Sequence, residues 1–372
     1  MIAARDIVIL GLSLRSSWGN GHATTYRALI AALQARGDHV LFLERDVPWY
    51  AEHQDPPAQL PCAPVLYASL EELQDRHAAA IAAADLVIVG SYVPDGIDVG
   101  AWVQRTARGV VAFYDIDTPV TVAALQRGDC AYLSPALIPH YDLYLSFTGG
   151  PTLQRLERVY GAPRAVPLYC AFDPEQYRPQ PQAHRYDLGY MGTYSDDRQP
   201  PLERLLLQPA LAWPQGRFVI AGPLYPPHIV WPDNVQRCAH LPPAQHMDFY
   251  NQQRFTLNLT RADMVLAGWS PSVRLFEAAA CATPIISDPW EGLETLFAPG
   301  REILIARRAA DVLGWLRELP EAQRMAIGEA GRRRVLAEHT AAHRAQALHD
   351  ALDRVADAAP STSARRSSHA LA

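Results

Sequence analysis

The stretch of residues 270–277 combines residue types that suit the binding of a phosphate and a sugar. Ser270 is a good N-cap and Pro271 suits the first helical position, so we expect a helix to begin at Ser270. The free N–H groups and positive dipole end of that helix attract anions, and Arg274 could add a contact to phosphate. Glu277 shares a face with Arg274, and its carboxylate can accept both hydroxyls of a ribose. The alternative is an ordinary Arg–Glu pair on the surface of an amphipathic helix.

A glycine-containing loop separates the first predicted strand from the first predicted helix. Gly19 and Gly21 allow the backbone to approach a ligand closely, and the helix start adds free N–H groups. The loop lacks a full Gly-x-Gly-x-x-Gly pattern, which disfavours a dinucleotide-binding oxidoreductase. His22 could be a general base, or a histidine that caps the helix or supports other residues.

Another loop of the first half carries polar residues directly after a predicted strand. Asp115, Asp117 and Thr118 end one strand, where they could recognise a sugar or activate an acceptor. Alternatively, Asp117 or Thr118 caps the helix that Pro119 starts. Asp115 and Asp117 have Asp-x-Asp spacing, but nothing around them demands a metal, so we predict no metal site.

The second half presents a similar set of loops. Gly192 and Gly222 follow predicted strands, and Arg198 is a candidate contact for a diphosphate. His240 follows a later strand and could border a nucleobase. The alternatives are a solvent-facing arginine and ordinary turn chemistry.

Alternating strands and helices must position these loops. The two halves predict an α/β fold of two doubly wound, Rossmann-like domains that face a central cleft. We expect the first domain at 1–175, the second at 176–356 with its last helix able to pack back on the first domain, and a disordered tail at 357–372. The predicted strands are 7–12, 39–44, 85–90, 109–115, 141–147, 186–191, 217–221, 255–259, 284–287 and 302–305. The predicted helices include 23–36, 70–83, 120–127, 199–208, 244–251, 271–281, 309–318, 321–337 and 340–356.

Composition excludes several classes of protein. The chain has 372 residues and a net charge of −6, which argues against a nucleic-acid-binding protein. The five cysteines are scattered and lack a Cys-x-x-Cys pair, so neither a disulfide framework nor a zinc site is expected. A reducing, cytoplasmic setting fits that pattern, and no window is apolar enough for a transmembrane segment.

The motif SPSVRLFEAAACATPIISD, with GLETLFAPGREIL and EHTAAHRAQAL downstream, resembles the GT-B glycosyltransferases, most closely their CgeB-like, spore-maturation branch. The resemblance implies a donor site in which Glu277 binds the ribose, and Ser272 and Arg274 meet the diphosphate. The stretch around Asp115 and the loop with Gly149 and Gly150 resemble N-terminal loops of the same branch, which face the acceptor and the transferred sugar.

The sequence departs from the family pattern at two positions. Many retaining relatives carry a glutamate where this chain has Trp269, and many members carry glycine where it has Ala282. The first departure bears on the stereochemistry of transfer. The second is mild provided that Ala282 does not adopt a left-handed conformation.

The resemblance therefore predicts a metal-independent, hexosyltransferase-like enzyme with a nucleoside-diphosphate sugar as co-substrate, no other cofactor and an unknown acceptor. In this prediction Gly192, Arg198, Gly222, His240 and residues 270–277 serve the donor, while His22 or Asp117 is the base. The alternatives are a sugar-nucleotide epimerase and a non-catalytic nucleotide- or sugar-binding protein of the same fold.

Overall fold

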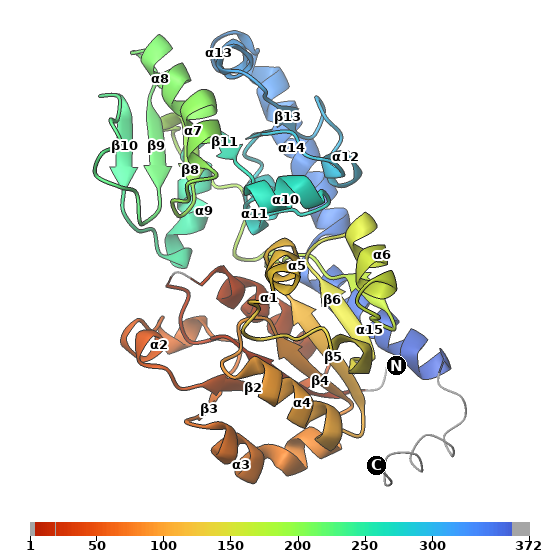
Figure 1. Cartoon of the computed structure of the whole chain (residues 1–372). Helices are drawn as coiled ribbons and strands as arrows, with labels where there is room; N and C mark the ends of the chain where they lie inside the picture. Colours follow the sequence, from red (N-terminus) through yellow and green to blue (C-terminus); the bar gives the residue numbers. More distant parts are fainter. Residues whose placement is uncertain (1–3, 19, 359–372) are drawn as a thin grey trace.

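A computed structural model describes residues 4–18 and 20–358, and it contains two parallel β-sheets flanked by helices (Figure 1). The strands form where the sequence has short apolar runs; every residue of the central strand β4 (Leu86–Gly90) is buried. Parallel strands covered on both faces require such runs, because neither face meets water. The predicted α/β class is therefore confirmed.

The first sheet has seven strands in the order β3-β2-β1-β4-β5-β6-β7. They are β1 (Asp6–Gly11), β2 (His39–Arg45), β3 (Val65–Tyr67), β4, β5 (Val110–Asp115), β6 (Leu143–Ser146) and β7 (Ala165–Pro167). The helices of this half are α1 (Gly21–Ala35), α2 (Pro48–Glu52), α3 (Leu70–Ala83), α4 (Gly96–Thr106), α5 (Thr118–Arg127) and α6 (Pro151–Arg158), with 3₁₀ turns at Pro57–Gln59 and Ile138–His140.

The second sheet has six strands in the order β10-β9-β8-β11-β12-β13. They are β8 (Tyr186–Met191), β9 (Phe218–Ala221), β10 (Val235–Cys238), β11 (Gln253–Asn258), β12 (Ile285–Ser287) and β13 (Leu304–Ile305). The helices are α7 (Gln199–Leu202), α8 (Gln208–Ala212), α9 (His246–Asn251), α10 (Ala262–Ala267), α11 (Val273–Ala280), α12 (Leu293–Leu296), α13 (Ala309–Glu318), α14 (Glu321–Glu338) and α15 (Ala341–Ala358), with a 3₁₀ turn at Pro243–Gln245.

The helix predicted at 199–208 is a composite of α7, a π-helical turn at Glu203–Leu207 and α8. Pro209 lacks a backbone N–H and therefore cannot make the hydrogen bond of a regular turn, which explains a locally wider helix. The composite segment buries Leu205 and Leu206 against the second sheet.

The last helix, α15, crosses back and packs on α1 of the first half. At the crossing, the Ala341 N–H donates to the Phe172 carbonyl over 3.0 Å. Farther along α15, the buried His349 Nε2 lies 2.7 Å from Asp38 Oδ2, just after α1. The two sheets are thus joined by two chain segments, one leading into β8 and one leading into α15. The tail from residue 359 onward lies outside the described residues.

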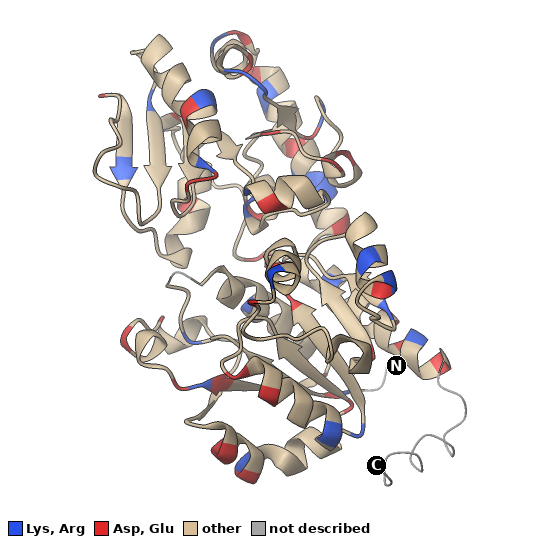
Figure 2. Ribbon diagram, in the orientation of Figure 1, with Lys and Arg blue, Asp and Glu red and all other residues tan. Residues whose placement is uncertain are grey.

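In the described part of the chain, charges of both signs are mixed and the cysteines are not cross-linked. Arginines and carboxylates alternate over the ribbons rather than forming a basic stripe (Figure 2). All five cysteines are free thiols. No described helix combines the length and apolarity that crossing a membrane requires.

Candidate functional site

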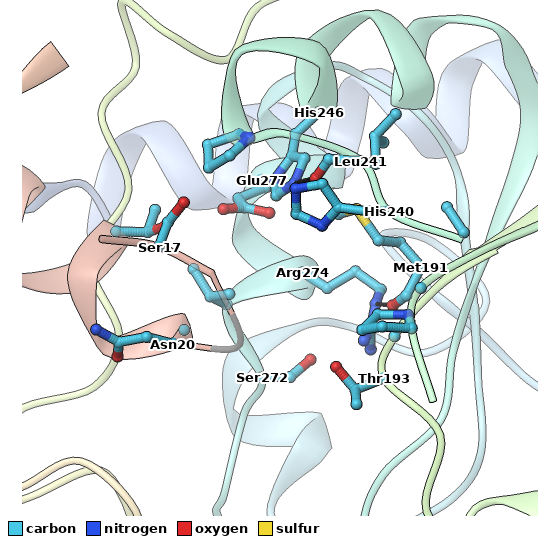
Figure 3. A pocket seen from close by; sticks show the side chains of 18 of the residues that line it. Ser17, Asn20, Met191, Thr193, His240, Leu241, His246, Ser272, Arg274 and Glu277 are labelled. Atoms are coloured by element: carbon cyan, nitrogen blue, oxygen red, sulfur yellow. Dashed lines mark hydrogen bonds between the residues drawn. The ribbon is translucent and has the colours of Figure 1, made fainter. Parts of the chain in front are cut away.

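A cavity of about 280 Å³ lies where the carboxyl ends of the two sheets face each other. Its walls come from both domains, as the position of ligand sites in doubly wound folds predicts. Figure 3 shows Ser17 and Asn20 of the first domain across from Arg274 of the second. The cavity is lined by Ser17, Asn20, Gly21, Thr24, Met191, Gly192, Thr193, Arg198, Ala221, Gly222, Pro223, His240, Leu241, Pro243, His246, Ser272, Val273, Arg274 and Glu277.

Glu277 lies on α11 and is the buried acid of this cavity. Its residue is only 2% exposed, and its Oε2 accepts a hydrogen bond from the Tyr250 hydroxyl over 2.9 Å. The carboxylate points into the cavity (Figure 3). A carboxylate has about four acceptor positions, so Glu277 retains acceptor capacity beside its tyrosine donors and can bind hydroxyl groups of a ligand.

Arg274, one turn earlier on α11, is fixed by the surrounding backbone and side chains. Its Nε donates to the Met191 carbonyl over 2.6 Å and its Nη1 donates to Asn258 Oδ1 over 2.9 Å. The guanidinium also lies over the Tyr190 ring, 5.1 Å from its centroid. Because both Arg274 and Glu277 are buried and bond to other groups, the alternative of a surface ion pair is wrong.

The helix that carries these residues begins later than predicted. α11 starts at Val273 with Ser272 at its N-cap, so the predicted start at Ser270 is wrong. Ser272 lines the cavity and its hydroxyl donates to Asn258 Oδ1 over 2.8 Å. Ser270 is buried in the domain interface instead, where its hydroxyl donates to the Gly268 carbonyl and lies 2.8 Å from Thr148 Oγ1. Ser270 is therefore not a wall of the cavity.

The predicted loops of the second domain converge on the same cavity. A β-carbon at Gly222, whose φ is +149°, would overlap the Gly192 carbonyl oxygen, so the two loops can pack this closely only without a side chain. Arg198 is half-buried, and its Nη2 donates to the Thr193 carbonyl over 2.6 Å. Arg198 and Arg274 thus both line the cavity and give its wall two positive charges. The 33 basic residues of the chain are all arginines, which stay protonated at any physiological pH.

His240 enters the cavity from the loop after β10 and touches the first domain. Its ring stacks on Trp18, with centroids 5.6 Å apart and an interplanar angle of 28°. Trp18, which follows β1, also packs against Trp49 and His53 of the α2 region. No local sequence pattern indicates a role for Trp18 at the cavity, because its partner there, His240, belongs to the other domain.

The glycine loop after β1 meets the cavity only in part. Gly21 lines it, and a β-carbon there would have open space, which leaves room for a ligand. Gly19 lies outside the described residues. His22 is half-buried beside Tyr92, and its backbone N–H donates to Asn20 Oδ1 over 3.1 Å. Burial lowers the pKa of His22 to about 4, so the imidazole is neutral at physiological pH.

Asp117 lies at the edge of the cleft but not in the cavity wall. Its side chain caps no helix; its Oδ2 accepts from the Tyr92 hydroxyl over 3.0 Å and lies 3.7 Å from Arg261 Nη1 of the second domain. Burial raises the pKa of Asp117, and the positive charge of Arg261 opposes that shift. Tyr92 and Arg261 are additional residues at the cleft that the sequence-based reading did not single out.

Asp115 and Thr118 lie beneath the cleft and do not face a substrate. Asp115 is fully buried, and its two oxygens accept from Thr121 and Tyr144 hydroxyls, each over 2.6 Å. Thr118 donates to the Asp115 carbonyl over 3.0 Å. Burial raises the pKa of Asp115 to about 6. These bonds hold the end of β5 in place, so the predicted sugar contacts of both residues are corrected.

Gly149 and Gly150 also have a structural role. The Gly149 N–H donates to the Trp269 carbonyl over 2.9 Å, and a β-carbon at Gly150 would overlap the Trp269 ring. Gly292, in the second domain, approaches the same ring equally closely. Neither glycine lines the cavity and the ring covers Gly150, so the structure gives these glycines a packing role in place of the predicted sugar contacts.

Comparisons with known proteins agree with this architecture. A family model described as "Glycosyl transferase-like" matches residues 198–350, which include most of the second domain and its cavity residues. The chain therefore carries a glycosyltransferase-like domain within a GT-B fold. No curated protein matches the sequence.

Solved structures resemble the whole chain in fold at low sequence identity. Sucrose-phosphate synthase from Thermosynechococcus elongatus matches with a TM-score of 0.67 and 15% identity over 95% of this chain and 100% of that chain. HepE from Anabaena, solved with UDP-glucose, matches with a TM-score of 0.67 and 13% identity over 94% and 100%. An alpha-glucosyltransferase solved with UDP-glucose and DNA matches with a TM-score of 0.72 and 12% identity over 94% and 100%.

Proposed function

We propose that this protein is a glycosyltransferase that takes a sugar, typically a hexose, from a nucleoside-diphosphate donor. The observation that carries the proposal is the pairing of Glu277 and Arg274 on the first turns of α11, both immobilised and both facing one cavity between two domains. Solved GT-B proteins that resemble the chain in fold were obtained with UDP-glucose, which supports this donor class. The motif resemblance supports a place in the CgeB-like branch.

In the proposed complex the Glu277 carboxylate accepts the ribose hydroxyls. The free N–H groups at the start of α11, together with Arg274 and Arg198, bind the diphosphate. Their fixed positive charge stabilises the negative charge that develops on the leaving diphosphate, without a metal ion. Among residues 4–18 and 20–358, no cluster of three or more His, Cys, Asp and Glu side chains could hold a metal.

The acceptor binds on the first domain, opposite the donor. If transfer inverts the anomeric configuration, the acceptor oxygen attacks the anomeric carbon while the bond from that carbon to the diphosphate oxygen breaks. The acceptor proton passes to Asp117 or His22, and the nucleoside diphosphate leaves with the bonding electron pair. We favour Asp117, because burial lowers the pKa of His22 to about 4 and makes its imidazole a weak base, whereas burial raises the pKa of Asp117 and its side chain remains 16% exposed between the domains.

Calorimetry with UDP and GDP tests the donor site. Glu277→Ala is expected to weaken binding of the preferred nucleoside diphosphate at least tenfold, because the ribose loses its acceptor. Glu294→Ala, which changes an exposed glutamate on nearby α12, is the matched control and leaves affinity unchanged. Equal affinity in the wild type and Glu277→Ala would contradict the ribose role.

Arg274 permits a second, independent assay. Arg274→Gln should weaken binding of the diphosphate at least tenfold but leave binding of the corresponding nucleoside unchanged, since only the diphosphate contacts the guanidinium. Arg204→Gln removes an exposed arginine of the same charge and serves as the control. If Arg274→Gln weakens binding of the nucleoside and of the diphosphate equally, the proposed contact of Arg274 with the diphosphate is wrong.

A non-catalytic nucleotide- or sugar-binding protein is the second candidate. It is favoured by Trp269, which occupies the position of the glutamate in retaining relatives and is half-buried, with its ring against Gly150 and Gly292. Slow hydrolysis of UDP- or GDP-sugars by the wild type, absent from Glu277→Ala, distinguishes an enzyme from a binding protein.

A further inference from the structure

Tyr92 holds an unusual backbone conformation next to the candidate base. It follows β4, and its φ of +63° lies in the left-handed region, which a bulky side chain rarely adopts. Such strain persists only where the surrounding structure enforces it, and it is concentrated at functional sites. The result of this conformation is that the Tyr92 hydroxyl donates to Asp117 Oδ2 over 3.0 Å.

The phenol ring of Tyr92 is held from two sides. It packs against the Tyr132 ring, with centroids 4.6 Å apart, and against the His22 imidazole, with centroids 5.4 Å apart. The Tyr132 hydroxyl bonds to Thr121 Oγ1 over 2.7 Å and so belongs to the network beneath the cleft. The direction of the Tyr92 hydroxyl, and with it that of the Asp117 carboxylate, is therefore fixed by the first domain.

The second contact of Asp117 comes from the opposite domain. Arg261 lies between β11 and α10, and its Nη1 is 3.7 Å from the same Oδ2 that Tyr92 contacts. Helix α10 packs against α5, which begins directly after Asp117. Arg261 therefore reaches Asp117 only when the two domains are docked on this side.

Several charged groups act on the Asp117 carboxylate. Burial raises its pKa, and the nearby carboxylate of Asp263 acts in the same direction. Arg261, the Tyr92 hydroxyl and Arg198 oppose the shift because they stabilise the charged form. Asp115, behind Asp117, is a further titratable neighbour, and the negative charge of Asp117 adds to the burial that raises the pKa of Asp115.

We propose that Tyr92 and Arg261 are positioning residues for Asp117, one from each domain, so that the base is fully assembled only in the closed cleft. The inference rests on the proposed function insofar as Asp117 is the base. Tyr92 fixes the direction of the carboxylate, and Arg261 holds it in the charged form that can accept the acceptor proton.

Titration of Asp117 in the full chain tests this without any substrate. Aspartate labelled with ¹³C at the carboxyl carbon gives one signal per residue, and the signal that disappears in Asp117→Asn is that of Asp117. Tyr92→Phe keeps the ring but loses the hydroxyl, so the pKa of Asp117 is expected to rise by roughly one unit. Arg261→Met is expected to raise it in the same direction.

Tyr141→Phe is the matched control, since it removes a buried hydroxyl of the same domain that has no hydrogen-bond partner among the described residues and should leave the Asp117 titration unchanged. An Asp117 titration in Tyr92→Phe that coincides with the wild type overturns the proposal. If Tyr92→Phe does not fold, an unchanged titration in Arg261→Met overturns it instead.

The pH dependence of UDP-glucose hydrolysis separates this inference from the proposed function. A base must be ionised, so a raised pKa moves the acid limb of kcat/KM to higher pH in both variants, while UDP affinity stays constant. If the pKa of Asp117 rises in the variants but the acid limb of kcat/KM does not move, the contacts of Tyr92 and Arg261 with Asp117 are supported, and the assignment of Asp117 as the base is wrong.

Discussion

The indole ring of Trp269 packs against the α-carbon of Gly150 and thereby joins the two domains. The contact is reinforced by the hydrogen bond from the Gly149 N–H to the Trp269 carbonyl, and Gly292 closes the other side of the ring. Trp269 itself has a φ of +43°. Trp269, which stands where retaining relatives carry a glutamate, thus connects the two domains at one side of the cleft.

Gly150→Ala tests this connection. The substitution adds a β-carbon that overlaps the indole ring, at a φ of +58°. Trp269→Ala removes the ring, so Gly150→Ala in that background keeps the backbone strain at φ +58° and ψ −145° but loses the overlap. Urea denaturation should show a clearly larger loss of unfolding free energy for Gly150→Ala in the wild type than in Trp269→Ala. Equal losses in the two backgrounds would show that Gly150 is not required for packing of the ring.

Ala282 is a second departure from the family pattern, and it is strained. Its φ of +56° lies in the left-handed region, so the condition under which the alanine would be harmless is not met. Relief of this strain outweighs the entropy that glycine loses on folding, so Ala282→Gly is expected to stabilise the protein by about 0.5–1 kcal/mol. Ala79→Gly, on the exposed face of α3, should instead destabilise it by about 1 kcal/mol. Destabilisation by both substitutions in urea titrations would contradict this reading of Ala282.

His339 makes stability depend on pH. Burial, followed by the charge of Arg344, lowers the pKa of His339 to about 3, and Arg344 Nη2 donates to its Nδ1 over 3.0 Å. The unfolded chain binds the proton at its ordinary pKa near 6.5, so the stability is present above that pH and is lost as the pH falls from 6.5 toward 3.

Replacement of His339 by glutamine keeps an acceptor for Arg344 and removes the titration. Between pH 7 and pH 5 the wild type should therefore lose as much as about 2 kcal/mol more unfolding free energy than His339→Gln, measured by urea denaturation at each pH. Parallel losses in the two proteins would exclude His339 as the cause.

The proposed neutralisation of the leaving group by arginines and helix N–H groups predicts resistance to chelation. Transfer or donor hydrolysis should continue unchanged in excess EDTA, as measured by release of the nucleoside diphosphate. Complete loss with EDTA and recovery with manganese would overturn the metal-independent proposal.

Much of the fold is predictable because its signals are local. The helices at 70–83 and 309–318 and the strand at 186–191 match α3, α13 and β8 residue for residue. At α3 the Ser69 hydroxyl accepts from the Glu72 N–H over 3.1 Å, the capping pattern expected at a helix start. By contrast, β3, β7 and β10 were missed. Each is a strand of three or four residues at the edge of its sheet, which is defined by its neighbour rather than by its own pattern.

The part of the site that was predictable from the sequence is the part whose residues all belong to one domain. Glu277, Arg274, Ser272 and Gly222 meet in the cavity because a single helix start and its neighbouring loops place them. Ser270 was misplaced because its hydroxyl pairs with Thr148, which is 122 residues away. The roles of Gly150, Trp18 and Arg261 likewise depend on how the domains dock, and no short stretch of sequence encodes that docking.

The return of α15 to α1 has a consequence for biosynthesis. The buried pair of Asp38 and His349 joins residues 311 positions apart, so the first domain emerges from the ribosome long before the helix that covers α1. Until then the apolar side of α1 that α15 buries is exposed to other nascent chains and to chaperones. The order of synthesis therefore makes completion of the first domain the final event of folding rather than the first.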